Sequence, residues 1–192
     1  VVLASTSAVY GDLPGRKDEG SPLAPLAPYA TSKLMAEALL AIYQRSYGLP
    51  VVRLRYFNVY GVRQRADSPY SGVLAKWTAA IRAGSQCLVF GDGGQTRDFV
   101  HVRDVARANV AALTAPLPEA NPLFVVATGK SVALNDVLGA LRHAAGNAAG
   151  VEYRPAREGD IVHSSADSSR LRAAFGWAPQ VTLEEGLREL IG

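Results

Sequence analysis

Hydrophobic residues fall into short runs separated by polar, glycine-rich and proline-rich stretches. Val1–Ala4 is a continuous apolar run, which is typical of a buried strand, and Val51–Tyr56 predicts a second strand. Between them, Tyr29–Tyr47 predicts a helix, because Pro28 precedes it and Gly48-Leu49-Pro50 supplies a stop signal. This strand–helix–strand order favours a parallel sheet with helices on its faces.

The alternation of strand and helix patterns continues to the end of the chain, after a polar loop between Gly11 and Pro28. We expect strands at Cys87–Phe90, Leu123–Val126 and Val151–Arg154, a turn at Gly91–Gly94, and helices at Gly72–Gly84, Val102–Ala115, Leu134–Ala145 and Ser168–Phe175. The capping box Thr182-x-x-Glu185 predicts the start of a last helix. The whole chain is therefore expected to be α/β, without an internal repeat.

The helix expected over Tyr29–Tyr47 is apolar on more than one side. Positions 34, 35, 38, 39, 41 and 42 are all apolar and cover more than a single stripe. A helix of this kind needs two packing partners, so we expect a sheet on one side and another helix on the other.

The start of the sequence adds an expectation about the whole protein. There is no initiator Met, and Val1–Ala4 has the pattern of an interior strand. We therefore expect a preceding part of the protein to supply earlier strands of the same sheet. Part of the 48% apolar content would then be surface that this missing part covers.

Composition and charge exclude several classes of protein. The 192 residues carry 20 Lys and Arg against 17 Asp and Glu, and a net charge of +3 is too small and too scattered to indicate nucleic acid or a membrane surface as partner. The single cysteine, Cys87, cannot form an internal disulfide and lies in an apolar stretch, where a buried thiol is expected. No apolar run approaches the roughly 20 residues of a membrane helix, so we expect a cytoplasmic protein.

Candidate chemistry gathers in three segments, Ser5–Gly11 and Arg55–Gly61 at strand ends and Tyr29–Lys33 at a helix start. Ligands bind at the carboxyl ends of strands in parallel α/β sheets. Tyr29 and Lys33 are four residues apart on one helical face, and a nearby ammonium favours the phenolate, so Tyr29 can act as a base. A strand-end hydroxyl such as Thr6 could bind the same substrate oxygen. Taken alone, the pair is better explained as a surface contact between residues four apart on a helix.

Further motifs follow in a fixed order. They are Val9-Tyr10-Gly11, Pro28-Tyr29-x-x-x-Lys33, Arg55-Tyr56-Phe57-Asn58-x-Tyr60-Gly61, the segment Phe90–Val105, Arg157-Glu158-Gly159-Asp160, and Ala166–Arg170. Together they resemble the extended short-chain dehydrogenase/reductase family, and within it the NAD-dependent nucleotide-sugar epimerases and dehydratases. The resemblance covers essentially the whole chain.

This resemblance implies a fold and a division into domains. The fold class would be α/β, the C-terminal part of a Rossmann-like doubly wound parallel sheet plus a smaller α/β substrate-binding domain. Residues 1–61 would complete the NAD-binding domain, and 62–192 would mainly bind the nucleotide sugar, with about 97–128 returning to the first domain. No strand followed by a glycine-rich phosphate loop occurs in the sequence, so we expect these 192 residues alone to be inactive.

The resemblance also implies roles for single residues. Thr6, Tyr29 and Lys33 would form the catalytic triad, with Tyr29, Lys33 and Tyr56 beside the NAD cofactor. The substrate-binding residues would be Thr6, Ser7, Asn58, Val73, Leu88, Phe90, Arg97, Arg157, Asp160 and Ser164. Arg97 and Arg157 would clamp a diphosphate, a task that suits the planar guanidinium.

Plainer explanations exist for several of these residues. Leu88 and Phe90 could be strand core, and Arg97 could form an ion pair with Asp98 or Asp104. His101 and His163 are better explained as structural residues than as acid or base groups, and His143 as a surface residue. No group of residues has metal-ligand spacing, so no metal is expected.

The reaction implied by the resemblance depends on Ala8. Dehydratases and decarboxylases of the family carry an acidic residue here, and alanine cannot protonate a departing hydroxyl. The expected reaction is therefore 4-epimerisation of a UDP-hexose, UDP-glucose or UDP-galactose, through a transient 4-keto sugar. Dehydration, decarboxylation or reduction of a nucleotide sugar remains an alternative, as does a non-catalytic NAD or nucleotide-sugar binding protein.

Two finer expectations complete the picture. Ser164 stands where hexose-only relatives carry a bulky tyrosine, so the N-acetylated sugars are expected to be accepted as well. The resemblance further implies a homodimer formed through the helix that carries Tyr29.

Overall fold

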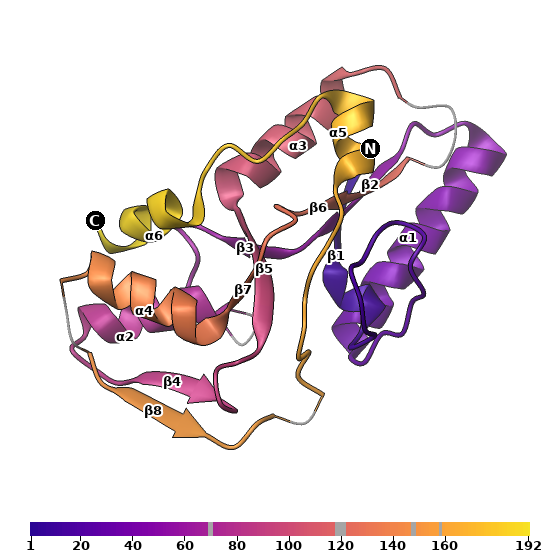
Figure 1. Cartoon of the computed structure of the whole chain (residues 1–192). Coiled ribbons are helices and arrows are strands. Elements are labelled where there is room, and N and C mark those ends of the chain that lie inside the picture. Colours follow the sequence, from indigo (N-terminus) through magenta and orange to yellow (C-terminus); the bar gives the residue numbers. More distant parts are fainter. Residues whose placement is uncertain (69–70, 118–121, 147–148, 158) are drawn as a thin grey trace.

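The computed structural model describes residues 1–68, 71–117, 122–146, 149–157 and 159–192. Its strands are β1 (Val2–Thr6), β2 (Val52–Tyr56), β3 (Asn58–Tyr60), β4 (Cys87–Phe90), β5 (Thr96–His101), β6 (Leu123–Val126), β7 (Ser131–Ala133) and β8 (Val151–Arg154). Its helices are α1 (Pro28–Tyr47), α2 (Val73–Arg82), α3 (Val102–Thr114), α4 (Leu134–Ala144), α5 (Ser169–Phe175) and α6 (Leu183–Ile191), with a 3₁₀ turn η1 at Ser7–Tyr10. Figure 1 shows α1, α3 and α5 around one group of strands and α2, α4 and α6 around the other.

The first group of strands is a parallel sheet in the order β1-β2-β6. Alternate residues of β6 face opposite sides: Phe124 and Val126 pack with α3 and α5, whereas Val125 packs with Val9 and Phe57 beside α1. Burial of both faces explains why every residue of β6 is apolar. The mixed α/β architecture expected from the sequence is confirmed.

The second group of strands supports the other half of the molecule. β3 and β5 are parallel, β7 pairs antiparallel with β5, and β4 pairs in parallel with β8. The largest apolar cluster lies here, where Trp77 of α2, Leu141 of α4 and Leu187 of α6 are almost completely buried. The short strands are thus anchored by helices packed against them.

The structure adds elements that the sequence patterns did not predict. The Ser/Thr-rich turn after β1 is a 3₁₀ turn, and β3, β7 and the polar first half of β5 are strands. β3 and β7 have three residues each, too few to show a periodic pattern, and tertiary pairing with β5 defines them. In β5 the polar segment Thr96-Arg97-Asp98 lies in the ladder because each side chain has its own partner.

Helix α1 packs against β1 and η1 on one side only, within the described part of the chain. Met35 and Leu39 are 67% and 56% exposed, and Ile42 is also exposed. The second packing partner that we predicted for this helix is not among the described residues. The homodimer through α1 therefore stays a prediction.

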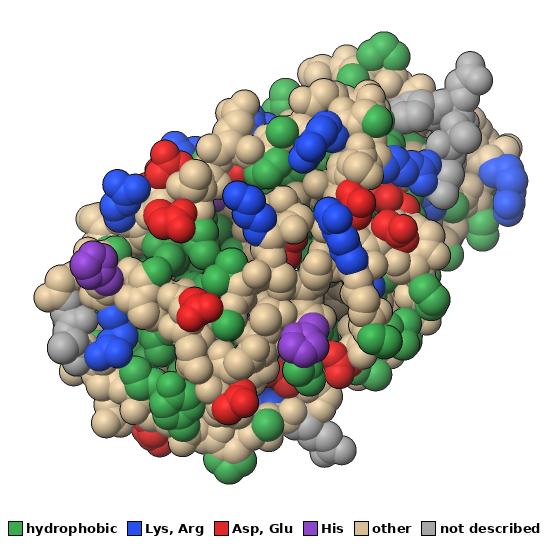
Figure 2. Space-filling model, in the orientation of Figure 1, with side chains coloured by type: hydrophobic (Ala, Val, Ile, Leu, Met, Phe, Trp, Pro, Cys, Tyr) green, Lys and Arg blue, Asp and Glu red, His purple; other side chains and the backbone are tan. Residues whose placement is uncertain are grey.

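The surface carries mixed charges. In Figure 2, basic and acidic side chains are interspersed over the visible face, with small hydrophobic areas between them. None of the helices in the described residues is long and apolar enough to span a membrane. Cys87 is buried, as predicted, and burial raises the pKa of its thiol.

Candidate functional site

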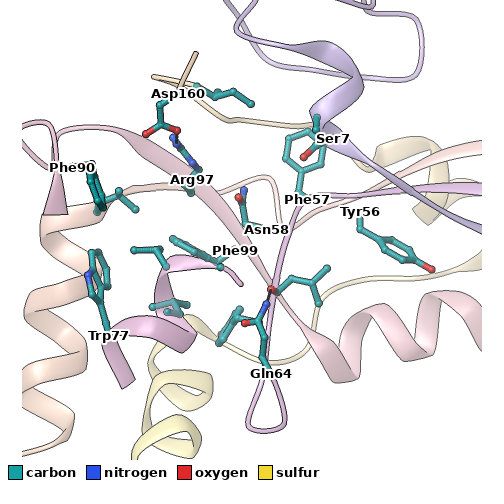
Figure 3. A pocket seen from close by; sticks show the side chains of 18 of the residues that line it. Ser7, Tyr56, Phe57, Asn58, Gln64, Trp77, Phe90, Arg97, Phe99 and Asp160 are labelled. Atoms are coloured by element: carbon teal, nitrogen blue, oxygen red, sulfur yellow. Dashed lines mark hydrogen bonds and ion pairs between the residues drawn. The ribbon is translucent and has the colours of Figure 1, made fainter. Parts of the chain in front are cut away.

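A cavity of about 400 Å³ opens between the carboxyl ends of β1 and β2 on one side and β4, β5 and α2 on the other. This volume lies within the usual range for a small-molecule site. Figure 3 shows Ser7, Asn58, Arg97 and Asp160 around it, with Phe90 and Trp77 on the far wall. The predicted site residues that line it are Thr6, Ser7, Tyr56, Asn58, Val73, Leu88, Phe90, Arg97, Arg157 and Asp160.

Thr6 ends β1 and begins η1 at the edge of this cavity. Its hydroxyl oxygen accepts a hydrogen bond from the backbone N–H of Ala8 at 3.2 Å. Because the hydroxyl is an acceptor in that bond, its own proton can still be donated. The cap thus fixes Thr6 and leaves a donor at the strand end.

Tyr29 and Lys33 come to the same strand end from the first turns of α1. The Lys33 ammonium donates to the backbone oxygen of Ala4 at 2.9 Å and lies 5.9 Å from the centre of the Tyr29 ring. Tyr29 is 44% exposed, and neither residue lines the cavity described above. Lys33 is therefore bonded to β1, and the Tyr29 ring lies near its ammonium and is exposed to solvent.

Tyr56 and Asn58 lie at the adjacent end of β2 and the start of β3. The Tyr56 hydroxyl donates to Asn109 of α3 at 2.8 Å, so the ring borders the cavity and its hydroxyl points away, as Figure 3 shows. Burial raises the pKa of Tyr56. The Asn58 amide donates to the Asp98 backbone oxygen at 3.1 Å, which holds its carboxamide at the cavity wall.

Arg97 is held within the cavity wall by an ion pair. Its Nη2 is 2.8 Å from Asp160 Oδ1, and its Nη1 donates to the Thr96 backbone oxygen at 2.9 Å. The partner is thus neither Asp98 nor Asp104, which the sequence suggested as a plain alternative. The side chain is 13% exposed, and burial lowers the pKa of this guanidinium while Asp160 and Asp12 oppose the shift.

Arg157 stacks on the opposite wall. Its guanidinium carbon lies 3.6 Å from the centre of the Phe90 ring, a close cation–π contact. Leu88 and Phe90 alternate with the buried Cys87 and Val89 along β4, so both face the cavity and neither is plain core. Trp77 Nε1 donates to the Leu88 backbone oxygen at 2.8 Å and fastens this wall to α2.

Ser164 is not among the residues that line the cavity. It is 8% exposed, its N–H donates to the Thr96 backbone oxygen at 3.1 Å, and its own backbone oxygen accepts from Ser131. Its backbone thus joins the 160s segment to β5. No contact with the cavity therefore supports the prediction that the small Ser164 side chain makes room for N-acetylated sugars.

The three histidines lie outside the cavity. His101 is 2% exposed, accepts the Arg103 N–H at the start of α3, and places Nε2 3.2 Å from Glu189. Burial lowers the pKa of His101. His143 and His163 are exposed. Among the described residues, no group of three or more His, Cys, Asp or Glu could hold a metal ion.

Sequence reasoning missed several residues of this site. Gln64, Trp77 and Phe99 line the cavity, and Asp98 behind it accepts three hydrogen bonds from Thr128 and Gly129. The signal for Trp77 and Phe99 was only that of apolar core. Asp98 was named as a partner for Arg97, and only the fold shows that it holds the turn after β6.

Three residues, Tyr29 and Lys33 of α1 and Tyr56 at the end of β2, fit part of a nicotinamide cofactor. Lys33 presents ammonium donors beside the Tyr29 ring, suited to ribose hydroxyls, and Tyr56 supplies an apolar face. The turn Gly91–Gly94 connects β4 to β5 and precedes no helix, so it is not a pyrophosphate loop. These residues would therefore hold the nicotinamide side of NAD.

The parallel sheet and the strand-end cavity with two arginines in its wall define an α/β protein. The model of the NAD dependent epimerase/dehydratase family matches residues 1–127, and the chain belongs to this family.

Individual relatives agree with this assignment. The chain is 36% identical over 194 residues to a putative UDP-glucose 4-epimerase of Methanocaldococcus jannaschii, covering 100% of this chain and 61% of that protein. It is similar to the structure of UDP-N-acetylglucosamine 4-epimerase from Methanobrevibacter ruminantium in complex with UDP-N-acetylmuramic acid, with a TM-score of 0.93, 38% identity, and coverage of 99% and 61%. For Thermus thermophilus UDP-glucose 4-epimerase in complex with NAD, the TM-score is 0.90 at 38% identity, with coverage of 99% and 62%. The chain thus spans about three fifths of the length of these relatives.

Proposed function

We propose that this chain supplies the catalytic and sugar-binding residues of an NAD-dependent UDP-hexose 4-epimerase. The observations that support the proposal are that Thr6 borders a cavity walled by two arginines, and that Lys33, close to the Tyr29 ring, bonds to the strand that Thr6 ends. Residues 1–61 would complete the NAD-binding domain. Residues 62–192 would mainly bind the nucleotide sugar, with about 97–128 belonging to the first domain.

In this proposal, Tyr29 removes the proton from the sugar O4 while the Lys33 ammonium stabilises the phenolate. Thr6 donates its hydroxyl proton to the same oxygen and orients it. NAD, held at Tyr29, Lys33 and Tyr56, would supply the acceptor and then the donor of the C4 hydride. Rotation of the 4-keto sugar between the two transfers inverts C4, and Tyr29 then gives the proton back.

The opposite wall would bind the rest of the nucleotide sugar. The guanidinium groups of Arg97 and Arg157 are suited to the two phosphates, and Asn58 offers an amide donor between them and the sugar. The Leu88, Phe90 and Val73 surface is apolar and can cover the uracil ring. Asp160, which holds Arg97 in the described structure, would remain beside the nucleotide.

A dehydratase or decarboxylase is the second candidate function, since relatives of both kinds occur among the similar proteins. Both the methyl side chain of Ala8 and its place in the cavity lining favour epimerisation, because no acid is available there for a leaving hydroxyl. N-acetylated substrates are supported by the named activity of the Methanobrevibacter relative rather than by the position of Ser164. A homodimer through α1 and a cytoplasmic location complete the proposal.

The test is an assay of the protein expressed from its complete reading frame. UDP-glucose and UDP-galactose should interconvert, and Tyr29→Phe should lower kcat on the order of 10²- to 10⁴-fold with an unchanged KM, because only the proton transfer is lost. Tyr47→Phe, at the exposed far end of the same helix, is the matched control. Absence of interconversion in the unaltered protein, or formation of a 4-keto-6-deoxy product, would overturn the proposal.

A further inference from the structure

Helix α1 carries the proposed base, yet it buries few of its own side chains. Of Pro28–Tyr47, only Ala30 and Glu37 are buried. Leu34 makes a partial contact with the apolar cluster around Val9. Apolar contacts are non-directional, and so few of them give little that would fix where α1 lies along β1.

A buried ion pair lies at the point where apolar packing would be expected. The Arg55 guanidinium of β2 donates to Glu37 through Nη2 at 2.7 Å and Nε at 3.0 Å, and the two side chains are 3% and 4% exposed. Ser5 of β1 donates its hydroxyl proton to the same carboxylate. A bidentate pair of this kind has a single favourable geometry, unlike an apolar contact.

The other side of the guanidinium is fixed as well. Arg55 Nη1 donates to the Tyr10 hydroxyl at 3.1 Å, and its carbon lies 5.0 Å from the centre of that ring. Tyr10 in turn donates to the Asp18 backbone oxygen at 2.7 Å. Arg55 therefore connects β2, η1 and α1 through a single side chain.

The spacing of these contacts relates them to the triad. Lys33 and Glu37 are one helical turn apart, and they bond to the consecutive β1 residues Ala4 and Ser5. Thr6 follows directly. A displacement of α1 along its axis would therefore break both contacts and would move Tyr29 relative to Thr6.

We propose that Glu37 and Arg55 are positioning residues, whose ion pair fixes the register of α1 against β1 and thereby the places of Tyr29 and Lys33 beside Thr6. This inference rests on the proposed epimerase function. A buried ion pair is a weak source of stability, since an apolar pair of similar volume is often as stable or more so. An experiment can therefore distinguish a positioning role from a stabilising role, because replacing the pair by apolar residues should keep the stability and lose the geometry.

The decisive variant combines Glu37→Leu and Arg55→Met with Ser5→Ala, which removes the hydroxyl that would otherwise lose its acceptor. Measured in the protein from the complete reading frame, it should melt like the unaltered protein and bind the UDP-sugar with a similar KM. Its kcat should fall on the order of 10- to 100-fold, because small misplacements of a reacting group have effects of this size. Arg107→Met, which breaks the ion pair to the buried Asp104 on α3, is the control and should leave kcat unchanged.

Deuterium at the sugar C4 distinguishes misplacement from a smaller fraction of folded protein. If the triad is misplaced, the chemical step slows and the isotope effect on kcat increases. A loss of folded protein lowers kcat and leaves the isotope effect as it was. An apolar variant with unaltered kcat and isotope effect would overturn the proposal.

Two further experiments apply if the apolar variant does not fold or if the unaltered protein is inactive. Should the apolar variant fail to fold, Arg55→Lys keeps the charge and loses the bidentate geometry, and it should show the same increase in the isotope effect. If the unaltered protein epimerises no UDP-sugar, the proposed function fails. The register then remains measurable in crystal structures of Arg55→Lys, where loss of the contact between Lys33 Nζ and Ala4 O supports the positioning role and its retention overturns it.

Discussion

The two walls of the cavity are stabilised in different ways. The β1–α1–β2 side is joined by directional polar contacts, among them the ion pair of Glu37 with Arg55 and the bond from Lys33 to Ala4. The side formed by β4, β5, α2 and α4 rests on an apolar core that contains Trp77 and Leu141. The proposed acid–base chemistry belongs to the first side, and the proposed binding of the nucleotide belongs to the second.

This difference follows from what each side has to do. Proton transfer needs atoms held in one geometry, which directional bonds provide at some cost in desolvation. A wall that covers a flat base needs shape and apolar area, which a packed core provides. Damage to the two sides should therefore have different signatures, loss of kcat on one and loss of stability or of affinity on the other.

The largest expected effect is on the stability of the apolar side. Leu141 of α4 is completely buried in its core, so Leu141→Ala should lower the free energy of unfolding by about 2–5 kcal/mol in urea titrations. The kcat of the remaining folded protein should be unchanged. Leu113→Ala on α3, where the leucine is 65% exposed, is the matched control and should alter stability by less than about 0.5 kcal/mol. A fall in kcat with Leu141→Ala would show that the two sides are not separable.

A smaller effect is expected for substrate affinity. Arg157 stacks on Phe90 and faces the cavity, so Arg157→Met should raise KM for the UDP-sugar on the order of 10-fold while kcat stays the same, because a charge-assisted contact to phosphate is lost. The difference should shrink at high salt. Arg154→Met, three residues earlier and paired with Glu152, is the control. A lower kcat at unchanged KM would place Arg157 in the chemical step instead.

The sequence predicted those elements that have long or well-bounded patterns. It also predicted residues that line the cavity where these belong to short continuous motifs. The helix predicted at Tyr29–Tyr47 and the strand predicted at Cys87–Phe90 agree closely with the structure, because flanking proline and glycine define the helix and a short apolar run defines the strand. β3 and β7 were beyond prediction, since three residues show no period and pairing with β5 creates them.

Sequence patterns also could not predict which residue pairs with each buried charge. Nothing in the motifs connects Arg55 to Glu37 or Arg97 to Asp160, because each pair forms between elements far apart in the chain. Glu37 lies among apolar residues of α1, and the sequence pattern alone does not show that it is buried. Ion pairs between separate elements thus position side chains in both walls of the cavity, and only the folded structure shows these pairs.

The smallest expected effect is on the pH dependence of stability, and it arises from His101 at the end of β5. Burial lowers the pKa of His101 below the ordinary value of about 6.5, although Glu189 opposes the shift and Arg103 adds to it. Between the two pKa values, His101 is protonated in the unfolded chain and neutral in the folded protein. The free energy of unfolding should therefore decrease as the pH drops below about 6.5, and it should stop decreasing below the pKa of the folded state. His101→Asn keeps a side-chain acceptor at the start of α3 and should flatten this part of the profile in urea titrations between pH 5 and about 7.5. His143→Gln, which changes an exposed histidine, should keep the slope of the unaltered protein, and an equal slope in both variants would contradict the assignment to His101.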